Sequence, residues 1–379
     1  MTAPIRVCFH APLLWPLWSD GALRFAGGAE VQQARLARGL VARGFEITVV
    51  TCDHGQPSPV VKHGVRVLKS YAIDQGLPGL RFFHPRLSRT MGALFAADAD
   101  VYYARGAALP AGQAYDAARW KRAAFVFGAA HDHDAFPALP ELRSARDRWW
   151  YRRALRGAHT IIAQSSVQQR LFRENLGMDS TLIRNLVEPP VSAGDPGRDL
   201  PVVWLATYKA AKRPEWFLEL ARALPQRRFI MCGVVPAPPE SDIAWIRAQQ
   251  AARELPNLEL RGTLEQSEVA TLFQDTALFV HTSPAEGFPN TVLEAWAAGI
   301  PSVTTVDPDG VVARERCGEV VATPEALITA VRAWMDAPER RRTAGARARA
   351  YAFAEHSPDA VLTKLGEVFR AAAATRGRA

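Results

Sequence analysis

Residues 277–305 constrain the fold of this chain more than any other stretch, because strand, loop, helix and strand signals follow one another there. The run ALFVHT reads as a buried strand, and the two prolines and one glycine just after it require a turn. A helix is expected to begin at Thr291, which has capping-box spacing with Glu294, and to stop at Gly299. In an open α/β sheet such a loop lies outside the carboxyl end of a strand, where ligands bind.

Two glutamates frame this loop. Glu286 lies in the loop and Glu294 in the first turn of the expected helix, with seven residues between them. An ionised carboxylate only accepts hydrogen bonds, which suits the hydroxyls of a ribose or a hexose. The N–H groups and the dipole of the helix start suit a phosphate beside them. The alternative for Glu294 is a capping residue that binds no ligand.

The segment EGFPNTVLEAWAAGIPSV, residues 286–303, resembles the signature of the retaining family 4 glycosyltransferases of GT-B fold (glycosyl transferases group 1), and a looser resemblance extends along almost the whole chain. It implies an α/β protein with two Rossmann-like domains facing across a deep cleft. It also implies that Glu286 contacts the transferred sugar and Glu294 the ribose of the nucleotide. The resemblance places the rest of the donor pocket at Gly287, Phe288, Pro289, Asn290 and Thr291.

The chain has 379 residues, enough for two domains of roughly 150 to 200 residues each. Proline, glycine and charged residues gather between about 186 and 200, which predicts a linker there. We expect an N-terminal acceptor-binding domain at 1–188 and a C-terminal nucleotide-sugar-binding domain at 200–355. The resemblance implies that residues 356–379 form a helix that returns to the first domain.

Cysteine usage and hydropathy exclude several classes of protein. The cysteines show no CxxC spacing, and no histidine pair has ligand spacing, so neither a disulfide framework nor a zinc site is indicated. The apolar N-terminus lacks the charged start and cleavage site of a signal peptide. No stretch reaches the roughly 18 unbroken apolar residues of a membrane span. A cytoplasmic location is expected.

The formal net charge of +8 is concentrated in the first half of the chain. Residues 1–190 hold 24 Lys and Arg against 15 Asp and Glu, whereas residues 191–379 hold 22 against 23. This excess predicts attraction either to an anionic membrane surface, which would place the protein at the inner face of the membrane, or to a phosphate-bearing acceptor. No recognised nucleic-acid motif occurs, so a nucleic-acid partner is not expected.

Two segments of the first half, residues 75–95 and 143–157, mix aromatic and basic side chains. Phe82 and Phe83 occur in the first, and Trp149 and Trp150 in the second. Each segment has two interpretations. It either lies on a membrane interface or forms a helix that buries its aromatic residues and exposes a basic face.

A strand, a long loop and a helix open the chain. Gly27 and Gly28 stand at the expected start of this helix, where glycine lets the backbone approach a phosphate closely. The alternative is a plain tight turn. The resemblance places both glycines near the donor diphosphate and the acceptor.

The expected strand AAFVFG is followed by HDHD. A histidine there has a pKa near neutrality and can donate a hydrogen bond to a sugar hydroxyl. The resemblance implies that His131 is the first-domain histidine close to the transferred sugar, with His133 as the second candidate. A purely structural role for either histidine stays open.

The loop TYKAAKR follows the expected strand PVVWLA. A lysine in such a loop either neutralises a diphosphate leaving group or is simply solvated. The loop resembles the family's phosphate loop, in which a glycine and an arginine precede a lysine, and Lys212 takes the place of that lysine. Ala206 and Thr207 occupy the glycine and arginine positions, so either Lys209 supplies the missing charge or the phosphate is held less tightly.

Three DxD triplets occur, at residues 98–100, 132–134 and 307–309. In glycosyltransferases of the other main fold such a triplet holds a divalent metal against the diphosphate. Here all three are interpreted as turns, because the glutamate pair belongs to the GT-B type. No metal and no cofactor are expected beyond the UDP- or GDP-sugar substrate.

The resemblance therefore implies a retaining, metal-independent hexosyltransferase that moves a hexose from a nucleoside-diphosphate sugar to a saccharide or lipid-linked acceptor, in bacterial polysaccharide or glycolipid assembly. Lys212 and helix-start N–H groups would stabilise the departing diphosphate. One alternative is a GT-B nucleotide-sugar epimerase or hydrolase. The other is a non-catalytic basic protein that binds membranes or nucleic acid.

Overall fold

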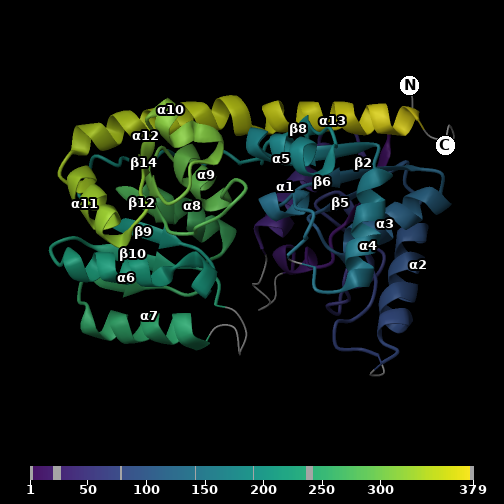
Figure 1. Cartoon of the computed structure of the whole chain (residues 1–379), viewed down its shortest axis with the longest axis horizontal. Coiled ribbons are helices and arrows are strands. Elements are labelled where there is room, and N and C mark those ends of the chain that lie inside the picture. The colour runs from purple at the N-terminus through teal and green to yellow at the C-terminus, as the bar shows by residue number, and fades with distance from the viewer. Residues whose placement is uncertain are drawn as a thin grey trace. The chain divides into compact units, whose positions relative to one another are not determined.

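The structure is a computed structural model that describes residues 3–19, 27–76, 79–140, 142–190, 192–235 and 242–375. The chain divides into two compact units. Unit 1 comprises Met1–Leu186 and Pro358–Ala379, and unit 2 comprises Val187–Ser357. In both units helices cover the faces of a parallel or mainly parallel sheet (Figure 1).

The sheet of unit 1 has the strand order β3-β4-β2-β1-β5-β6-β7-β8 in the described residues. All neighbours are parallel except β3 and β4. Its central strands are buried on both faces, as parallel strands rich in Val, Phe and Tyr require. The strands are β1 (Arg6–His10), β2 (Glu46–Thr51), β3 (Val60–Lys62), β4 (Val65–Lys69), β5 (Val101–Arg105), β6 (Ala124–Gly128), β7 (Thr160–Ala163) and β8 (Thr181–Leu182).

Two hydrophobic clusters lie on the two faces of this sheet, one built around α1 and α13 and the other around α2 to α5. Local sequence fixes several helix ends. Ser165 caps the start of α5 by accepting the N–H of Gln168, and Gly177 ends the helix with a positive φ of 64°. The helices are α1 (Gly28–Val41), α2 (Ser88–Ala97), α3 (Leu109–Trp120), α4 (Ala145–Arg156), α5 (Ser166–Leu176) and α13 (Pro358–Ala374), with the short turns η1 (Trp15–Leu17), η2 (Phe82–Leu87) and η3 (Asp132–Ala135).

The last helix, α13, is part of unit 1 although it follows the whole of unit 2 in the chain. Its apolar side packs on the sheet, where the Phe369 ring lies against Phe9 and Tyr103. Leu362 packs against α1 at Gly39, where an added Cβ would lie only 2.3 Å from its side chain. This packing accounts for the amphipathic character of α13.

Unit 2 has a parallel sheet with the order β11-β10-β9-β12-β13-β14 in its described residues. Gly233 lies just after β10 with a φ of 142°, and a Cβ there would lie 1.7 Å from the carbonyl oxygen of Ala206, so only glycine lets these two loops approach. The strands are β9 (Val202–Leu205), β10 (Phe229–Cys232), β11 (Leu258–Leu260), β12 (Leu278–His281), β13 (Ser302–Thr304) and β14 (Gly318–Val320).

Two clusters again fill the two faces, with α6, α7 and α11 on one and α8, α9, α10 and α12 on the other. The helices are α6 (Pro214–Ala223), α7 (Asp242–Glu254), α8 (Gln266–Gln274), α9 (Asn290–Ala297), α10 (Val311–Glu315), α11 (Pro324–Met335) and α12 (Pro338–His356), with the turns η4 (Ala210–Lys212) and η5 (Pro308–Gly310).

The two aromatic and basic segments of the first half meet on unit 1. The Arg146 guanidinium of α4 lies 3.5 Å from the centroid of the Phe82 ring of η2, which also contacts Trp150. Tyr151 is buried, whereas Trp149 and Phe83 are each about three-fifths exposed. Each segment therefore packs one aromatic ring against unit 1 and leaves another exposed to solvent, and the membrane interface stays a prediction.

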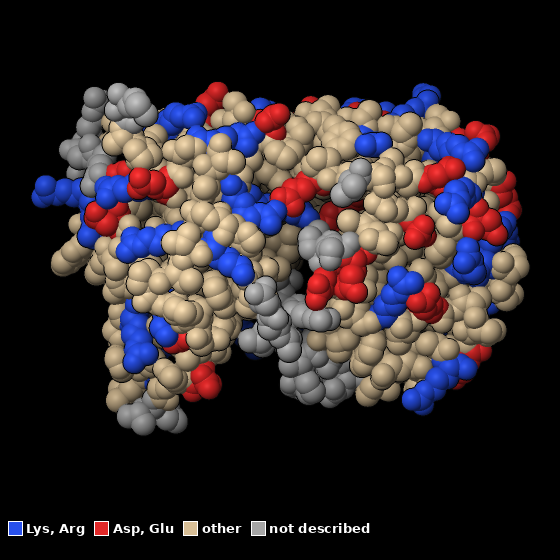
Figure 2. All heavy atoms as spheres, turned by 180° about the vertical axis from the view of Figure 1, so that it is seen from behind, with Lys and Arg blue, Asp and Glu red and all other residues tan. Residues whose placement is uncertain are grey.

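Charged side chains cover both units. Figure 2 shows basic side chains spread over the visible face of unit 1, on the left, and both signs interspersed over the visible face of unit 2. Among the helices that the structure describes, none combines the length and the apolar character needed to cross a lipid bilayer.

Candidate active site

The candidate site of unit 2 forms where two neighbouring strands end. β9 and β12 pair in parallel, with Trp204 opposite Val280, so the loops that follow them start at the same edge of the sheet. The first loop carries Lys212 and the second carries Glu286. This is the carboxyl edge at which α/β sheets bind ligands.

Lys212, Glu286 and His281 converge on one oxygen atom. The Nζ atom of Lys212 contacts Oε1 of Glu286, and Nε2 of His281 lies 3.8 Å from the same oxygen. The His281 side chain is 4% exposed, Glu286 18% and Lys212 29%. No described residue forms a hydrogen bond with the other carboxylate oxygen, Oε2. Glu286 is thus held on one side and has an acceptor available on the other.

The charge state of Glu286 follows from these contacts. Burial by itself would raise the pKa of Glu286, but the adjacent His281 imidazole and the Lys212 ammonium outweigh it and lower the pKa to about 2. At neutral pH the carboxylate is ionised. It therefore accepts hydrogen bonds from hydroxyl groups and does not act as a proton donor.

A buried hydrogen-bond relay fixes the backbone of Lys212. The indole Nε1 of Trp204 donates to Oγ1 of Thr282 at 2.9 Å, and Thr282 donates in turn to the carbonyl oxygen of Lys212 at 2.5 Å. Trp204 and Thr282 are both almost completely buried. The sequence alone did not single out these two residues or His281, because each stands within or next to an apolar strand.

The start of α9 differs from the sequence-based expectation. The helix begins at Asn290 with Pro289 as its N-cap, and no side-chain hydrogen bond caps it. The predicted capping box of Thr291 and Glu294 is therefore wrong, because Pro289 ends the extended loop and its fixed φ leads directly into the helix. Glu294 lies one turn inside α9 and is partly buried. Gly299 ends the helix with a φ of 81°, as predicted.

The loop before α9 is anchored by its own side chains. Phe288 is buried, and its ring lies 6.1 Å from that of Trp296 and 4.7 Å from that of His356. Gly287 and Pro289 are also buried. The loop is thus held against α9 and α12, which positions its backbone beside Glu286.

The loop after β9 carries both predicted lysines. Lys209 precedes η4, and its carbonyl oxygen accepts the N–H of Lys212 at 2.9 Å. Lys209 is partly exposed. The N–H of Ala206 donates to the carbonyl of Cys232 at 3.2 Å, so the residue in the expected glycine position joins the loops after β9 and β10. Of the two lysines, Lys212 is the one whose ammonium group contacts Glu286.

In unit 1 the HDHD segment begins two residues after β6. Its first residue, His131, is the N-cap of η3, and the other three lie within η3. The Nδ1 atom of His131 accepts the N–H of His133 at 3.2 Å, and the two rings are tilted by 43° with centroids 4.3 Å apart. Since Nδ1 accepts, the neutral His131 ring carries its proton on Nε2 and can donate it. Asp134 is buried and accepts three backbone N–H groups, from Ala107, Ala130 and His131.

The aspartates of the three DxD triplets serve turns and caps. Asp98 and Asp100 form ion pairs with Arg6 at 2.8 and 2.9 Å. Burial raises the pKa of Asp134 despite its three hydrogen bonds. Asp307 accepts the N–H of Val312 at 2.7 Å, in the first turn of α10. These contacts agree with the interpretation of the triplets as turns.

Gly27 and Gly28 stand where α1 begins. Gly28 is the first residue of the helix and Gly27 is its N-cap in an extended conformation. A Cβ on Gly27 would lie 2.7 Å from a carboxylate oxygen of Glu30, but that oxygen is the far end of a flexible side chain and can move away. Both glycines belong to unit 1, whereas Lys212 and Glu286 belong to unit 2.

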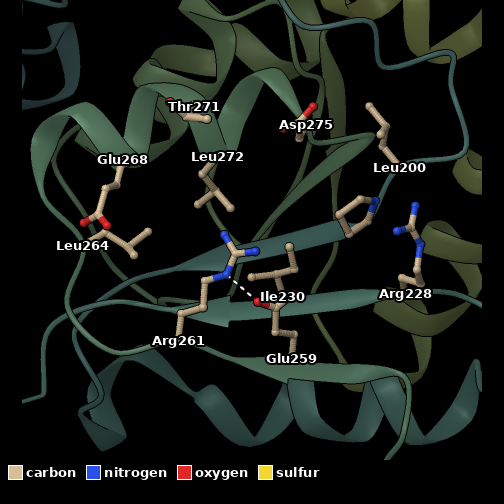
Figure 3. Close-up of a pocket in the computed structure, with 11 residues that line it drawn as sticks. Leu200, Arg228, Ile230, Glu259, Arg261, Leu264, Glu268, Thr271, Leu272 and Asp275 are labelled. Carbon is tan, nitrogen blue, oxygen red and sulfur yellow. Dashed lines mark hydrogen bonds and ion pairs between the residues drawn. The ribbon is translucent and has the colours of Figure 1, made fainter.

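A separate cavity of about 690 Å³ lies in unit 2 between α8 and the strands β10 and β11. Figure 3 shows the Arg261 guanidinium pointing into it beside Glu259, with a distance of 2.7 Å between their charged groups. None of the predicted site residues lines this cavity. It is therefore distinct from the Lys212 and Glu286 cluster.

The amino-acid sequence matches two family models. Residues 27–186 match the Glycosyl transferase 4-like domain, and residues 201–337 match Glycosyl transferases group 1. Together these ranges span most of the chain. A search of curated proteins gives no match.

Solved structures share the whole architecture. Sucrose-phosphate synthase from Thermosynechococcus elongatus has a TM-score of 0.77 and 17% identity, with 97% of this chain and 99% of that chain covered. HepE of Anabaena in complex with UDP-glucose has a TM-score of 0.74 and 17% identity, with 96% and 99% covered. WaaG, a glycosyltransferase involved in lipopolysaccharide biosynthesis, has a TM-score of 0.65 and 16% identity, with 96% of this chain and 99% of that chain covered. This likeness confirms the expected fold of two Rossmann-like domains.

The cluster in unit 2 has the chemistry that sugar transfer needs. Lys212 offers a cation for a leaving diphosphate, and Glu286 offers an ionised acceptor for sugar hydroxyls. Both matched family models describe glycosyltransferases, and the solved structures share the architecture of this chain. The chain belongs to the group 1 glycosyltransferases and has the GT-B fold.

Proposed function

We propose that this glycosyltransferase is a retaining hexosyltransferase that takes its sugar from a nucleoside-diphosphate donor bound by unit 2. The observation that carries the proposal is the convergence of Lys212 and His281 on Oε1 of Glu286. It leaves Oε2 to accept a hexose hydroxyl while the ammonium group stands beside it. Glu294, one turn inside α9, would accept hydroxyls of the nucleotide ribose.

The donor is proposed to be a UDP- or GDP-sugar. HepE, which shares the fold, was solved in complexes with UDP, with UDP and glucose, and with UDP-glucose. In this chain the donor diphosphate would lie between Lys212 and the start of α9, whose dipole favours an anion. Gly287, Phe288 and Asn290 would line its sugar side through the loop backbone, with Lys209 as a second cation at the diphosphate.

Departure of the diphosphate develops negative charge, and a fixed cation stabilises it most effectively in a site where water is scarce. The buried relay from Trp204 through Thr282 holds the backbone of Lys212 and so limits the space that its ammonium group can reach. Because Lys212, Lys209 and the start of α9 supply positive charge at the diphosphate themselves, we propose that transfer needs no metal ion.

Retention of the anomeric configuration is proposed to proceed by attack on the face from which the diphosphate departs. This route needs no enzyme nucleophile. Glu286 would then act by binding sugar hydroxyls in the oxocarbenium-like transition state. His131 of unit 1, with a proton on Nε2, would donate a hydrogen bond to a sugar hydroxyl.

The acceptor is proposed to be a saccharide or lipid-linked saccharide of bacterial polysaccharide or glycolipid assembly, reached from the cytoplasmic side of the membrane. The surface formed by η2 and α4 supports this. It exposes Phe83 and Trp149 together with the arginines of α4, a combination of apolar and basic groups that suits an anionic membrane interface.

A donor screen tests the proposal. The full chain is incubated with UDP- and GDP-hexoses, with and without candidate saccharide acceptors, and nucleoside diphosphate release is measured. NMR of the product reports the anomeric configuration. Release of free sugar without acceptor would instead identify an epimerase or hydrolase. Binding to vesicles or nucleic acid without any stabilisation by UDP or GDP would identify a non-catalytic protein.

A further inference from the structure

A half-buried arginine at the carboxyl edge of the unit 1 sheet has no assigned role. Arg105 is the last residue of β5, and its side chain is only partly exposed. We propose that Arg105 forms a binding site for an anionic group, a phosphate or a carboxylate, on the acceptor substrate. The inference rests on the proposed function in one respect, namely that unit 1 holds the acceptor.

The strand order places Arg105 where an α/β sheet binds ligands. From β1 the chain moves outward to β2, β4 and β3, and then returns to the other side of β1 with β5. β1 and β5 therefore flank the topological switch point, and their register sets His10 opposite Ala104. The crevice outside the carboxyl ends of two such strands is the preferred ligand site of an open sheet.

Neutral groups hold the guanidinium of Arg105. One terminal nitrogen donates to Oε1 of Gln164 at 3.0 Å and to Oδ1 of Asn185 at 2.6 Å. Both amide side chains are almost completely buried. Gln164 is itself fixed, because its Nε2 donates to the carbonyl oxygen of Ala130 at 2.7 Å. The arginine is thus oriented by a preorganised set of amides.

The positive charge of Arg105 is not neutralised by the protein. No Asp or Glu among the described residues forms an ion pair with it, and its buried Nε has no hydrogen-bond partner there. Arg6 and Arg153, also half-buried in unit 1, each pair with an aspartate. A half-buried guanidinium without a counter-ion loses hydration and gains no ion pair, so an incoming oxyanion would gain charge-assisted hydrogen bonds from it.

The surroundings connect this arginine to the predicted sugar site. The residue that Gln164 contacts, Ala130, directly precedes His131. An anion on Arg105 would therefore lie on the same edge of unit 1 as the histidine proposed to contact the transferred sugar. The net positive charge of residues 1–190 would attract such an acceptor before it binds.

The test compares anionic and neutral sugars as probes. Glucose 6-phosphate, glucuronate and glucose are titrated against the full chain at matched ionic strength, and apparent Kd values are obtained from thermal stabilisation. We expect the parent to bind at least one anionic sugar about tenfold or more tightly than glucose. Arg105→Gln should lose that preference, since a charge-assisted pair contributes about tenfold or more. The two probes show whether phosphate or carboxylate is preferred.

Three variants make the result decisive. Arg119→Gln removes an exposed arginine of unit 1 and should leave the preference unchanged. Lys212→Gln should also keep the preference for the anionic sugar. If Lys212→Gln loses this preference and Arg105→Gln keeps it, the anion binds to unit 2 and the inference is overturned. Arg105→Lys keeps the charge and should bind within about threefold of the parent. Equal losses in the Lys and Gln variants would show that Arg105 only supports the fold.

The outcome separates this inference from the proposed function. Nucleoside diphosphate release that persists while the parent shows no preference for either anionic sugar would overturn the anion site alone. A preference that depends on Arg105 in a chain that turns over no donor would support the anion site and contradict sugar transfer.

Discussion

Lys212 and Glu286 lie 74 positions apart in the chain and form an ion pair in unit 2. Each stands on a loop that leaves one of two adjacent parallel strands, β9 and β12. His281, at the end of β12, approaches the same carboxylate oxygen. In the proposed reaction a donor diphosphate would compete with Glu286 for the Lys212 ammonium group, and His281 would remain as the second partner of Glu286.

Replacing Lys212 should weaken stabilisation of the leaving diphosphate. We expect Lys212→Gln to lower kcat/KM for the donor about 10²- to 10³-fold, because a preorganised charge at the leaving group contributes about 3 to 4 kcal/mol. Steady-state release of nucleoside diphosphate measures this. Arg213→Gln is the matched control, since the neighbouring guanidinium lies 4.9 Å from the Trp216 ring. Equal losses in the two variants would contradict a specific role for Lys212.

The ion pair should also make stability depend on pH. Folding lowers the pKa of Glu286 from its ordinary value of 4.5 to about 2, so its contribution is present above pH 4.5 and is lost as pH falls through 2. The full difference corresponds to about 3 kcal/mol. Urea unfolding of the parent and Glu286→Gln should show a gap that is largest at pH 6 and smaller at pH 3. A gap independent of pH would show that the carboxylate charge does not stabilise the fold.

The buried hydroxyl of Thr282 should affect donor binding as well as stability. Thr282→Val leaves the indole N–H of Trp204 without an acceptor and releases the carbonyl of Lys212, which should cost about 1 to 3 kcal/mol and raise the donor KM severalfold. Thr276→Val is a suitable control, because the equally buried Thr276 donates only to the carbonyl of Leu272. It should lose stability without a change in KM. A parallel rise in KM in both variants would argue against the relay.

The η2 and α4 surface should bind anionic membranes. Phe83→Ser combined with Trp149→Ser removes two exposed aromatic groups, and burial of each such side chain contributes about 1.5 to 3 kcal/mol. We expect cosedimentation with phosphatidylglycerol vesicles to fall tenfold or more, and the parent to bind phosphatidylcholine vesicles weakly. Ile243→Ser, at an exposed position of unit 2, should bind as the parent does. Unchanged binding of the double variant would place any membrane contact elsewhere.

Local signals made the core of the candidate site predictable. The strand at 278–281, the loop with Glu286 and the glycine stop at Gly299 each follow from side-chain types within a few residues. The local pattern offered Lys209, Lys212 and Arg213 as cations in a loop after a strand, and the family resemblance selected Lys212 among them. The start of α9 was misplaced because the TxxE pattern also occurs inside a helix, and Pro289 was the stronger start signal.

Long-range contacts explain what the sequence did not reveal. His281 reads as part of an apolar strand, and its approach to Glu286 depends on how the following loop turns back. Trp204 and Thr282 lie 78 positions apart, and strand pairing alone brings them together. Arg105 likewise looks like any basic residue at a strand end until the absence of a carboxylate partner in the described structure is known. Periodicity and motif spacing carry no information on such contacts.

The most direct measurement is nucleoside diphosphate release by the parent and by Glu286→Gln, with the anomeric configuration of the product determined by NMR. We expect the parent to release UDP or GDP in an acceptor-dependent reaction that retains the configuration. Glu286→Gln should lower kcat at least about 100-fold while the fold is kept. A variant that turns over as fast as the parent would show that Glu286 does not bind the transferred sugar as described. A product with inverted configuration would contradict the retaining reaction.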